Sequence, residues 1–208
     1  RFGGPQVLEL VEVERPEPTA SQVLIRVAAA VVNFAETLMR EDRYVASYTL
    51  PAIPGSEITG TIEALGSNVE GLAVGQRVGA VLAASKTLTG GYAEYVVAEA
   101  AITVPLPDSL DFESATALLV QGLTALYLTR EANLAGRDVL ITAAGGGVGS
   151  LLIQLSLRAD ANKVLAVASN KEKRELALSM GAAEAFDYSA LPDLSADLIY
   201  ESVGGSVL

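Results

Sequence analysis

A glycine-rich turn at residues 143–150 is the part of the sequence whose spacing most clearly indicates chemistry. The run Ala144-x-Gly146-x-x-Gly149 follows the dinucleotide-binding pattern GxGxxG, with alanine at its first position. Small residues let a pyrophosphate approach backbone N–H groups at a helix N-terminus, where the helix dipole favours negative charge. We therefore predict a dinucleotide-binding turn made of Ala144, Gly145, Gly146, Gly147, Val148 and Gly149.

The segments on either side of the turn support this interpretation. Residues 139–143 are apolar and predict a strand, while Val148, Leu151, Leu152 and Leu155 repeat at helical spacing after it. A transmembrane span and a glycine-rich hairpin are the alternatives. Four glycines and several polar residues argue against a span, and the helical period argues against a hairpin.

The composition excludes several classes of function. The 208 residues are 50% hydrophobic and 19% charged, which predicts ample core and little disorder. The net charge is −11 and no run of lysine or arginine occurs, so nucleic acid and anionic membranes are poor partners. The sequence contains neither cysteine nor histidine, which excludes disulfides and the usual zinc ligands. No secretory signal precedes the first apolar segment, and a cytoplasmic location is expected.

Short apolar segments separated by glycines and prolines fill the first hundred positions. The expected strands are residues 7–13, 22–32, 58–64, 77–82, 92–97 and 101–104, with one helix near residues 35–41. Many short strands at this spacing suggest a small antiparallel barrel.

The pattern changes after the prolines at positions 105 and 107. Residues 111–131 are expected to be helical, and the strand at 139–143 then begins an alternation of strands and helices. Further strands are expected at 163–168, 185–187 and 197–201, and a helix at 171–180 with Asn170 as N-cap and Gly181 as its stop. Such alternation predicts a parallel sheet covered by helices.

The sequence resembles the medium-chain dehydrogenase/reductase superfamily, in its zinc-independent quinone oxidoreductase (zeta-crystallin-like) branch. The matching runs are FGGPQVL (2–8), VNFA (32–35), PAIPGSE (51–57), GQRV (75–78), GGYAEY (90–95), QGLTA (121–125), the glycine motif and VGG (203–205). The resemblance implies an α/β fold class: a Rossmann-type doubly wound parallel sheet, truncated here, preceded by a GroES-like small β-barrel domain. It implies a GroES-like substrate domain at 1–110, lacking its C-terminal return, and an incomplete NADP-binding domain at 111–208. A longer chain is therefore expected, and a homodimer when it is full length.

The same resemblance bears on metal. Zinc-dependent members carry cysteine, histidine and cysteine at positions where this chain has Asn33, Ser56 and Gln121. None of these is a good zinc ligand, so no metal site is expected. Without a Lewis acid, reduction of an already polarised acceptor is favoured over oxidation of an alcohol.

The cofactor implied is NADP(H). In the resembled branch the equivalents of Ser169, Lys173 and Tyr188 surround the 2′-phosphate, and Ser169 stands where NAD-binding members usually have an acidic residue. The alternative for Lys173 is a solvated lysine on an exposed helix. Asn170 and Val203 complete this part of the predicted cofactor-binding set.

Three residues are candidates near the reacting atoms. Asn33 and Thr124 match residues that face the nicotinamide, although Asn33 could instead cap a helix and Thr124 could bond within its own helix. Tyr44 is the catalytic candidate, because it follows Asn33 by eleven positions, the spacing of a substrate-side tyrosine in related enoyl reductases. Its phenol could donate a hydrogen bond or a proton, or it could be a rim tyrosine.

We therefore predict an NADPH-dependent, zinc-independent reductase of a small-molecule quinone or α,β-unsaturated carbonyl compound. An enoyl-thioester reductase is the alternative enzyme, and a nucleotide-binding protein without turnover is the alternative from another class.

Overall fold

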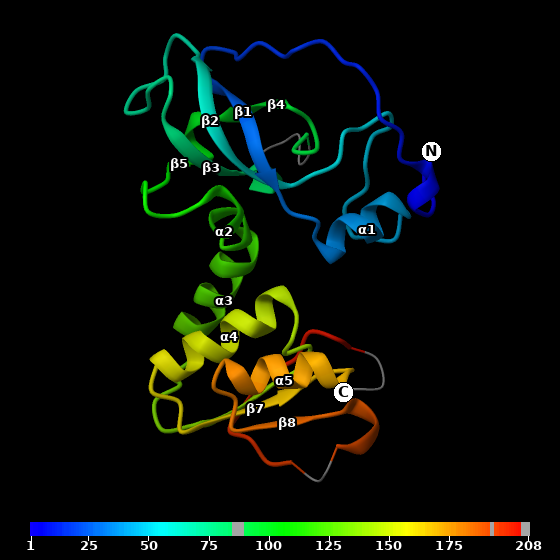
Figure 1. Ribbon diagram of the computed structural model, residues 1–208, viewed down its shortest axis with the longest axis vertical. Helices are drawn as coiled ribbons and strands as arrows, with labels where there is room; N and C mark the ends of the chain where they lie inside the picture. Colours follow the sequence, from blue (N-terminus) through cyan, green and yellow to red (C-terminus); the bar gives the residue numbers. More distant parts are fainter. Residues whose placement is uncertain (85–89, 192–193, 205–208) are drawn as a thin grey trace. The chain divides into compact units, whose positions relative to one another are not determined.

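The chain divides into two compact units, Arg1–Leu119 and Val120–Leu208. The computed structural model describes residues 1–84, 90–191 and 194–204 (Figure 1). Gly205, the last residue of the VGG motif, lies outside the described residues.

The first unit is built on a five-stranded antiparallel sheet in the order β4-β1-β2-β3-β5. The strands are β1 (Gln22–Ala30), β2 (Glu57–Leu65), β3 (Arg77–Val81), β4 (Tyr95–Glu99) and β5 (Thr103–Pro105). Helix α1 (Phe34–Arg40) lies between β1 and β2, and helix α2 (Phe112–Ala117) follows β5. Short 3₁₀ turns are η1 (Pro5–Val7), η2 (Leu82–Ala84) and η3 (Ala100–Ile102). Apolar side chains from the central strands, including Val23, Ile25, Ile58, Ile62 and Val78, form its core.

The strand expected at residues 7–13 is wrong. The chain forms η1 and then runs on as irregular backbone, with Leu10 fully exposed and Val11 and Val13 more than half exposed. Alternating valine and glutamate suit one face of a sheet, but a strand also needs a neighbour to pair with its backbone. Among the described residues, no strand pairs with this segment.

The helix expected over residues 111–131 is two helices, α2 and α3 (Val120–Glu131). Helix α2 belongs to the first unit because its Thr116 hydroxyl meets the Thr59 hydroxyl of β2 at 2.6 Å. Thr59 also donates to the carbonyl oxygen of Phe112 at 2.9 Å. These buried contacts place the division between the units after residue 119, nine positions beyond the expected boundary at residue 110.

The second unit contains a four-stranded parallel sheet in the order β8-β7-β6-β9. Its strands are β6 (Asp138–Ile141), β7 (Lys163–Val167), β8 (Glu184–Phe186) and β9 (Leu198–Tyr200), joined by α4 (Gly147–Arg158), α5 (Lys171–Ser179) and η4 (Tyr188–Ala190). In chain order these strands lie 3-2-1-4, the order of the first part of a Rossmann sheet. Figure 1 shows α4 and α5 beside this sheet, and α3 packs on α4.

Local sequence explains these elements. Residues 164–167 of β7 are all buried, as expected for an inner strand of a parallel sheet. The Asn170 side chain accepts a hydrogen bond from the Lys173 N–H at 2.9 Å, so its N-cap role is confirmed. Gly181, with φ of +106°, follows the end of α5. Within the described part of the chain, no helix combines the length and apolarity needed to cross a membrane.

Candidate functional site

The glycine turn joins the end of β6 to the start of α4. Gly146 is the N-cap of α4, and its N–H donates to the carbonyl of Ala143 at 2.8 Å. A Cβ on Gly149 would lie 2.4 Å from the same carbonyl oxygen, so only glycine permits this approach. The first N–H groups of a helix have no intrahelical acceptor, and two of the first three in α4 belong to glycines, Gly147 and Gly149.

A cavity of about 270 Å³ lies beside this turn. Its lining combines the turn, the end of β7, helix α5 and the segment after β9: Ala143, Gly145, Gly146, Ala168, Ser169, Lys173, Tyr188 and Val203. Six of the sequence-predicted cofactor residues are therefore brought together around one cavity. The other predicted residues of the turn, Ala144, Gly147, Val148 and Gly149, lie outside the lining and shape the turn and the first turn of α4. Asn170 caps α5.

The wall of the cavity is held by close contacts. The backbone N–H of Ala143 donates to the Tyr188 hydroxyl at 2.7 Å. Ala143 itself has φ of +46°, an uncommon conformation for a residue with a side chain. A Cβ on Gly145 would lie 2.6 Å from the Cβ of Lys173, so α5 passes directly against the turn. Ser169, Lys173 and Tyr188 thus line the same cavity.

The segment after β9 is organised by Glu201. Its carboxylate accepts from the Val203 N–H at 2.6 Å and the Gly204 N–H at 2.9 Å, which places Val203 at the cavity. The Gly204 and Val203 N–H groups hold the pKa of Glu201 below its ordinary value. Sequence reasoning missed Glu201, although an acidic residue just beyond a parallel strand lies at the edge where such sheets bind ligands.

The first unit holds a second polar cluster, around the start of α1. The Glu36 carboxylate is 5% exposed and accepts from the Asn33 N–H (2.7 Å), the Ser56 N–H (2.7 Å), the Ser56 hydroxyl (2.6 Å) and the Tyr92 hydroxyl (2.6 Å). The Asn33 side-chain amide donates to the fully buried Glu57 at 2.8 Å and to the Ser56 hydroxyl at 3.4 Å. Asn33 is thus both the N-cap of α1 and a member of a buried network.

Two tyrosines border this cluster. Burial, with the hydrogen bond to Glu36 next in size, raises the pKa of Tyr92 well above its ordinary range. Burial and the nearby Glu36 charge raise the pKa of Tyr48 to about 12. The Tyr48 hydroxyl is buried and has no hydrogen-bond partner among the described residues.

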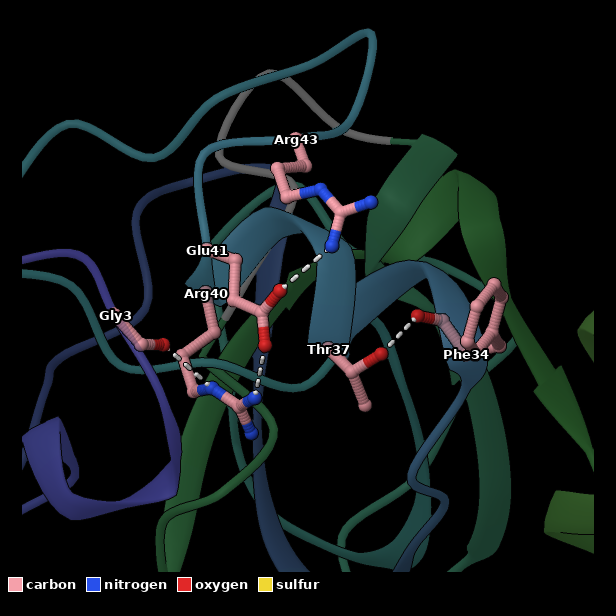
Figure 2. A network of polar contacts seen from close by, with 6 residues as sticks. All are labelled: Gly3, Phe34, Thr37, Arg40, Glu41 and Arg43. Carbon is pink, nitrogen blue, oxygen red and sulfur yellow. Dashed lines mark hydrogen bonds and ion pairs between the residues drawn. The ribbon is translucent and has the colours of Figure 1, made fainter.

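Tyr44 and Thr124 lie outside these two groups. Tyr44 is 42% exposed and follows the end of α1. Figure 2 shows how that end is held: Arg40 donates to the Gly3 carbonyl and pairs with Glu41, which also pairs with Arg43. The Thr124 hydroxyl donates to the carbonyl of Val120 at 2.6 Å, a bond within its own helix.

The three positions expected to correspond to zinc ligands are not equipped for zinc. Asn33 and Ser56 lie in the first unit, where the serine hydroxyl donates to Glu36 and the asparagine amide to Glu57. Gln121 lies in the second unit, at the start of α3, where its side chain packs against Gly147. Amide and hydroxyl groups replace the thiolate and imidazole that zinc prefers. In the described residues no cluster of three or more acidic residues is placed to hold a metal.

Comparisons with known proteins match both units. Residues 19–108 match the alcohol dehydrogenase GroES-like domain, and residues 147–207 match the family described as zinc-binding dehydrogenase. The chain is 40% identical over 191 residues to the quinone oxidoreductase of Rattus norvegicus, covering 90% of this chain and 56% of that protein.

Solved structures of quinone oxidoreductases also match this chain. The quinone oxidoreductase from Coxiella burnetii matches with a TM-score of 0.92 and 32% identity, over 100% of this chain and 68% of that one. The quinone oxidoreductase from Thermus thermophilus, solved alone and in complex with NADPH, matches with a TM-score of 0.84 and 36% identity, over 100% and 66%. This chain spans little more than half the length of the curated relatives that it matches.

Proposed function

We propose that this chain, which belongs to the quinone oxidoreductase family of the medium-chain dehydrogenase/reductases, is part of an NADPH-dependent reductase. In this proposal hydride is transferred to a quinone or an α,β-unsaturated carbonyl compound. The observation that carries the proposal is the cavity beside the glycine turn, where Ser169, Lys173 and Tyr188 meet.

These three residues suit a 2′-phosphate better than a free 2′-hydroxyl. Lys173 supplies positive charge, and Ser169 offers a hydroxyl donor. The Tyr188 hydroxyl accepts a hydrogen bond from Ala143, which leaves its own proton to donate to an anion. None of the described residues that line the cavity is acidic, whereas NAD-binding sites usually hold the ribose hydroxyls with a carboxylate. The Thermus thermophilus relative was solved in complex with NADPH, which agrees with this assignment.

The glycine turn supplies the site for the pyrophosphate. Gly145 and Gly146 line the cavity without side chains that would fill it, and α4 begins at Gly147. Its N-terminal N–H groups and dipole favour a negatively charged group there. When bound, the nicotinamide supplies the hydride, while the residues of this chain bind and orient the nucleotide.

The first unit supports reduction of a polarised acceptor. Asn33 is oriented by Glu57 and by the Glu36 carboxylate that anchors its backbone, so its amide is held in one place. Asn33, Ser56 and Gln121 do not provide ligands for a Lewis-acid metal, and reduction of a quinone or enone does not require such a metal. On the family resemblance, we propose Asn33 in the first unit and Thr124 in the second as residues that contact the nicotinamide.

An enoyl-thioester reductase is the second candidate, and Tyr44 is the residue that favours it. Its side chain is partly exposed, and in this candidate its phenol donates a hydrogen bond or a proton to the substrate carbonyl. That role predicts a large loss of turnover in Tyr44→Phe, with little change in cofactor binding.

A substrate panel with the full-length protein tests the proposal. NADPH oxidation is followed with an ortho-quinone, a para-quinone, an open-chain enone and an enoyl thioester, and alcohol oxidation with NADP⁺ serves as the contrast. Reduction of quinones or enones supports the proposal, and exclusive use of the thioester supports the second candidate. NADPH binding without turnover on any acceptor would identify a nucleotide-binding protein, and zinc-dependent alcohol oxidation would contradict all three.

A further inference from the structure

We infer that Arg174 is a positioning residue for the 2′-phosphate subsite: it ties the end of β7, which precedes Ser169, to the turn that presents Tyr188. The inference rests on the proposed NADPH-binding function and adds a residue through which selectivity for the phosphate is set. Arg174 is not among the residues that line the cavity, so it acts through its neighbours.

A single nitrogen of the guanidinium makes the connection. Arg174 Nη1 donates to the carbonyl oxygen of Ala168 at 3.0 Å and to Oδ2 of Asp187. Ala168 immediately precedes Ser169, and Asp187 immediately precedes Tyr188. The arginine and aspartate side chains are 25% and 32% exposed, so the pair is shielded more than a typical surface ion pair.

The Arg174 bridge between Ala168 and Asp187 lies just beyond the point where β7 and β8 stop pairing. The parallel pairing of β7 with β8 ends at Val167 and Phe186, and the Ala168 N–H still donates to the Phe186 carbonyl at 3.0 Å. Ser169 and Tyr188 lie beyond the end of this pairing, and both line the cavity. Arg174 links the residues just before both, and so fixes the spacing of two walls of the cavity.

The second oxygen of Asp187 carries the constraint on to Tyr188. Its Oδ1 accepts from the backbone N–H of Ser189 at 3.0 Å and from the Ser189 hydroxyl at 2.7 Å. These bonds cap η4, the turn that begins at Tyr188. The Ser189 hydrogen bonds, with the Arg174 pair as a further cause, hold the pKa of Asp187 below its ordinary value. The aspartate therefore stays charged and keeps both contacts near neutral pH.

Helix geometry separates the roles of two adjacent basic residues. Neighbouring residues of an α-helix point about 100° apart. Lys173 accordingly lines the cavity, while Arg174 reaches the Ala168 carbonyl and the Asp187 carboxylate. Lys173 supplies charge to the phosphate, and Arg174 supplies the geometry.

The competing explanation is that Arg174 acts only through its positive charge. Asp187→Asn distinguishes a charge effect from a positioning effect, because the two predict opposite changes in affinity for the 2′-phosphate. The substitution removes a negative charge near the subsite, so a charge effect alone would tighten phosphate binding. Asparagine has only one acceptor oxygen and cannot serve both Arg174 and Ser189 as the carboxylate does, so loss of positioning would weaken binding.

The experiment is calorimetric titration of the full-length protein with 2′,5′-ADP and with 5′-AMP, which differ in the 2′-phosphate. The proteins are wild type, Arg174→Gln, Arg174→Lys, Asp187→Asn and the control Lys171→Gln. Lys171 lies on the same helix but only pairs with Glu175 at 3.6 Å on an exposed surface, so its loss removes equal charge without touching the bridge.

We expect Arg174→Gln to weaken 2′,5′-ADP about tenfold and 5′-AMP less than about twofold, the scale of one lost hydrogen bond to a charged group. Asp187→Asn should weaken 2′,5′-ADP selectively, Arg174→Lys should restore most of the affinity, and Lys171→Gln should resemble wild type. Thermal unfolding of each variant checks the fold. If Arg174→Gln does not fold, Asp187→Asn and Arg174→Lys decide the question.

Other outcomes overturn the inference. Equal losses for both nucleotides, or tighter 2′,5′-ADP binding by Asp187→Asn, would overturn positioning while the proposed function stands. Failure of the wild-type protein to bind 2′,5′-ADP more tightly than 5′-AMP would contradict the proposed NADPH preference itself, and the inference would fall with it.

Discussion

The Tyr92 hydroxyl donates a 2.6 Å hydrogen bond to the Glu36 carboxylate, which is almost entirely buried. The same hydroxyl lies 2.9 Å from the carbonyl oxygen of Val31. With the bonds to Asn33 and Ser56, Glu36 joins the start of α1 to the segment entering β2 and to the segment before β4. One carboxylate thus organises three parts of the first unit.

Tyr92→Phe should therefore destabilise the protein by about 2 kcal/mol, because it removes a bond to a charged, buried acceptor. Tyr48→Phe is the matched control, since its buried hydroxyl has no described partner. Removing that hydroxyl should change the free energy of unfolding by no more than about 0.5 kcal/mol, or should be stabilising. Chemical denaturation of the two variants measures both values, and equal losses would show that the Tyr48 hydroxyl is bonded in solution.

The parallel part of the fold could be predicted from the sequence, because its determinants are local. The periodic spacing of apolar residues, the Asn170 cap and the glycine turn each depend on a few consecutive residues. Each of them matches an element in the second unit. The segment at residues 7–13 has an equally regular pattern and forms no strand. Alternation determines which face of a strand is apolar, whereas pairing depends on a distant segment.

The side-chain hydrogen-bond networks could not be predicted from the sequence. The donors to Glu36 come from positions 33, 56 and 92, and nothing in the spacing shows that they converge. Likewise, Thr59 and Thr116 meet across 57 positions and keep α2 in the first unit. Lys173 and Arg174 are adjacent cations in the sequence, and only the geometry shows that the first lines the cavity and the second bonds to Ala168 and Asp187.

The glycines of the turn should separate stability from binding. Gly149→Ala places a Cβ 2.4 Å from the Ala143 carbonyl oxygen, and the backbone must shift, so we expect a loss of about 3 kcal/mol in unfolding free energy. Gly146→Ala meets only that oxygen at 3.1 Å, with ordinary φ of −90°, and should cost no more than about 1 kcal/mol.

Gly146→Ala, which should remain folded, should instead lower the affinity for NADPH. Gly146 lines the cavity, so a methyl group there should weaken NADPH at least about tenfold although the protein remains stable. Denaturation and fluorescence titration of NADPH measure the two effects. Gly146→Ala with unchanged NADPH affinity would show that the nucleotide does not approach this glycine.

Metal should be irrelevant to both fold and activity. The Ser56 hydroxyl and the Asn33 amide already donate to buried carboxylates, and neither is a ligand that zinc prefers. Elemental analysis of the full-length protein should find no stoichiometric zinc, and a chelator should leave the melting temperature and the reductase rate unchanged. Activity lost with a chelator and regained with zinc would contradict the proposed zinc-independent mechanism.

The cofactor preference should depend on Lys173 and Ser169. Lys173→Ala should weaken NADPH by about 1–2 kcal/mol and leave NADH unchanged, because only NADPH has the phosphate to which a charged hydrogen bond is lost. Ser169→Asp should go further, since a carboxylate would repel the phosphate and could hold the ribose hydroxyls of NADH, so the preference should invert. Dissociation constants for both cofactors, measured at one ionic strength, test this directly. Equal losses for NADPH and NADH in Lys173→Ala would mean that the lysine supports the fold of the cavity rather than the phosphate.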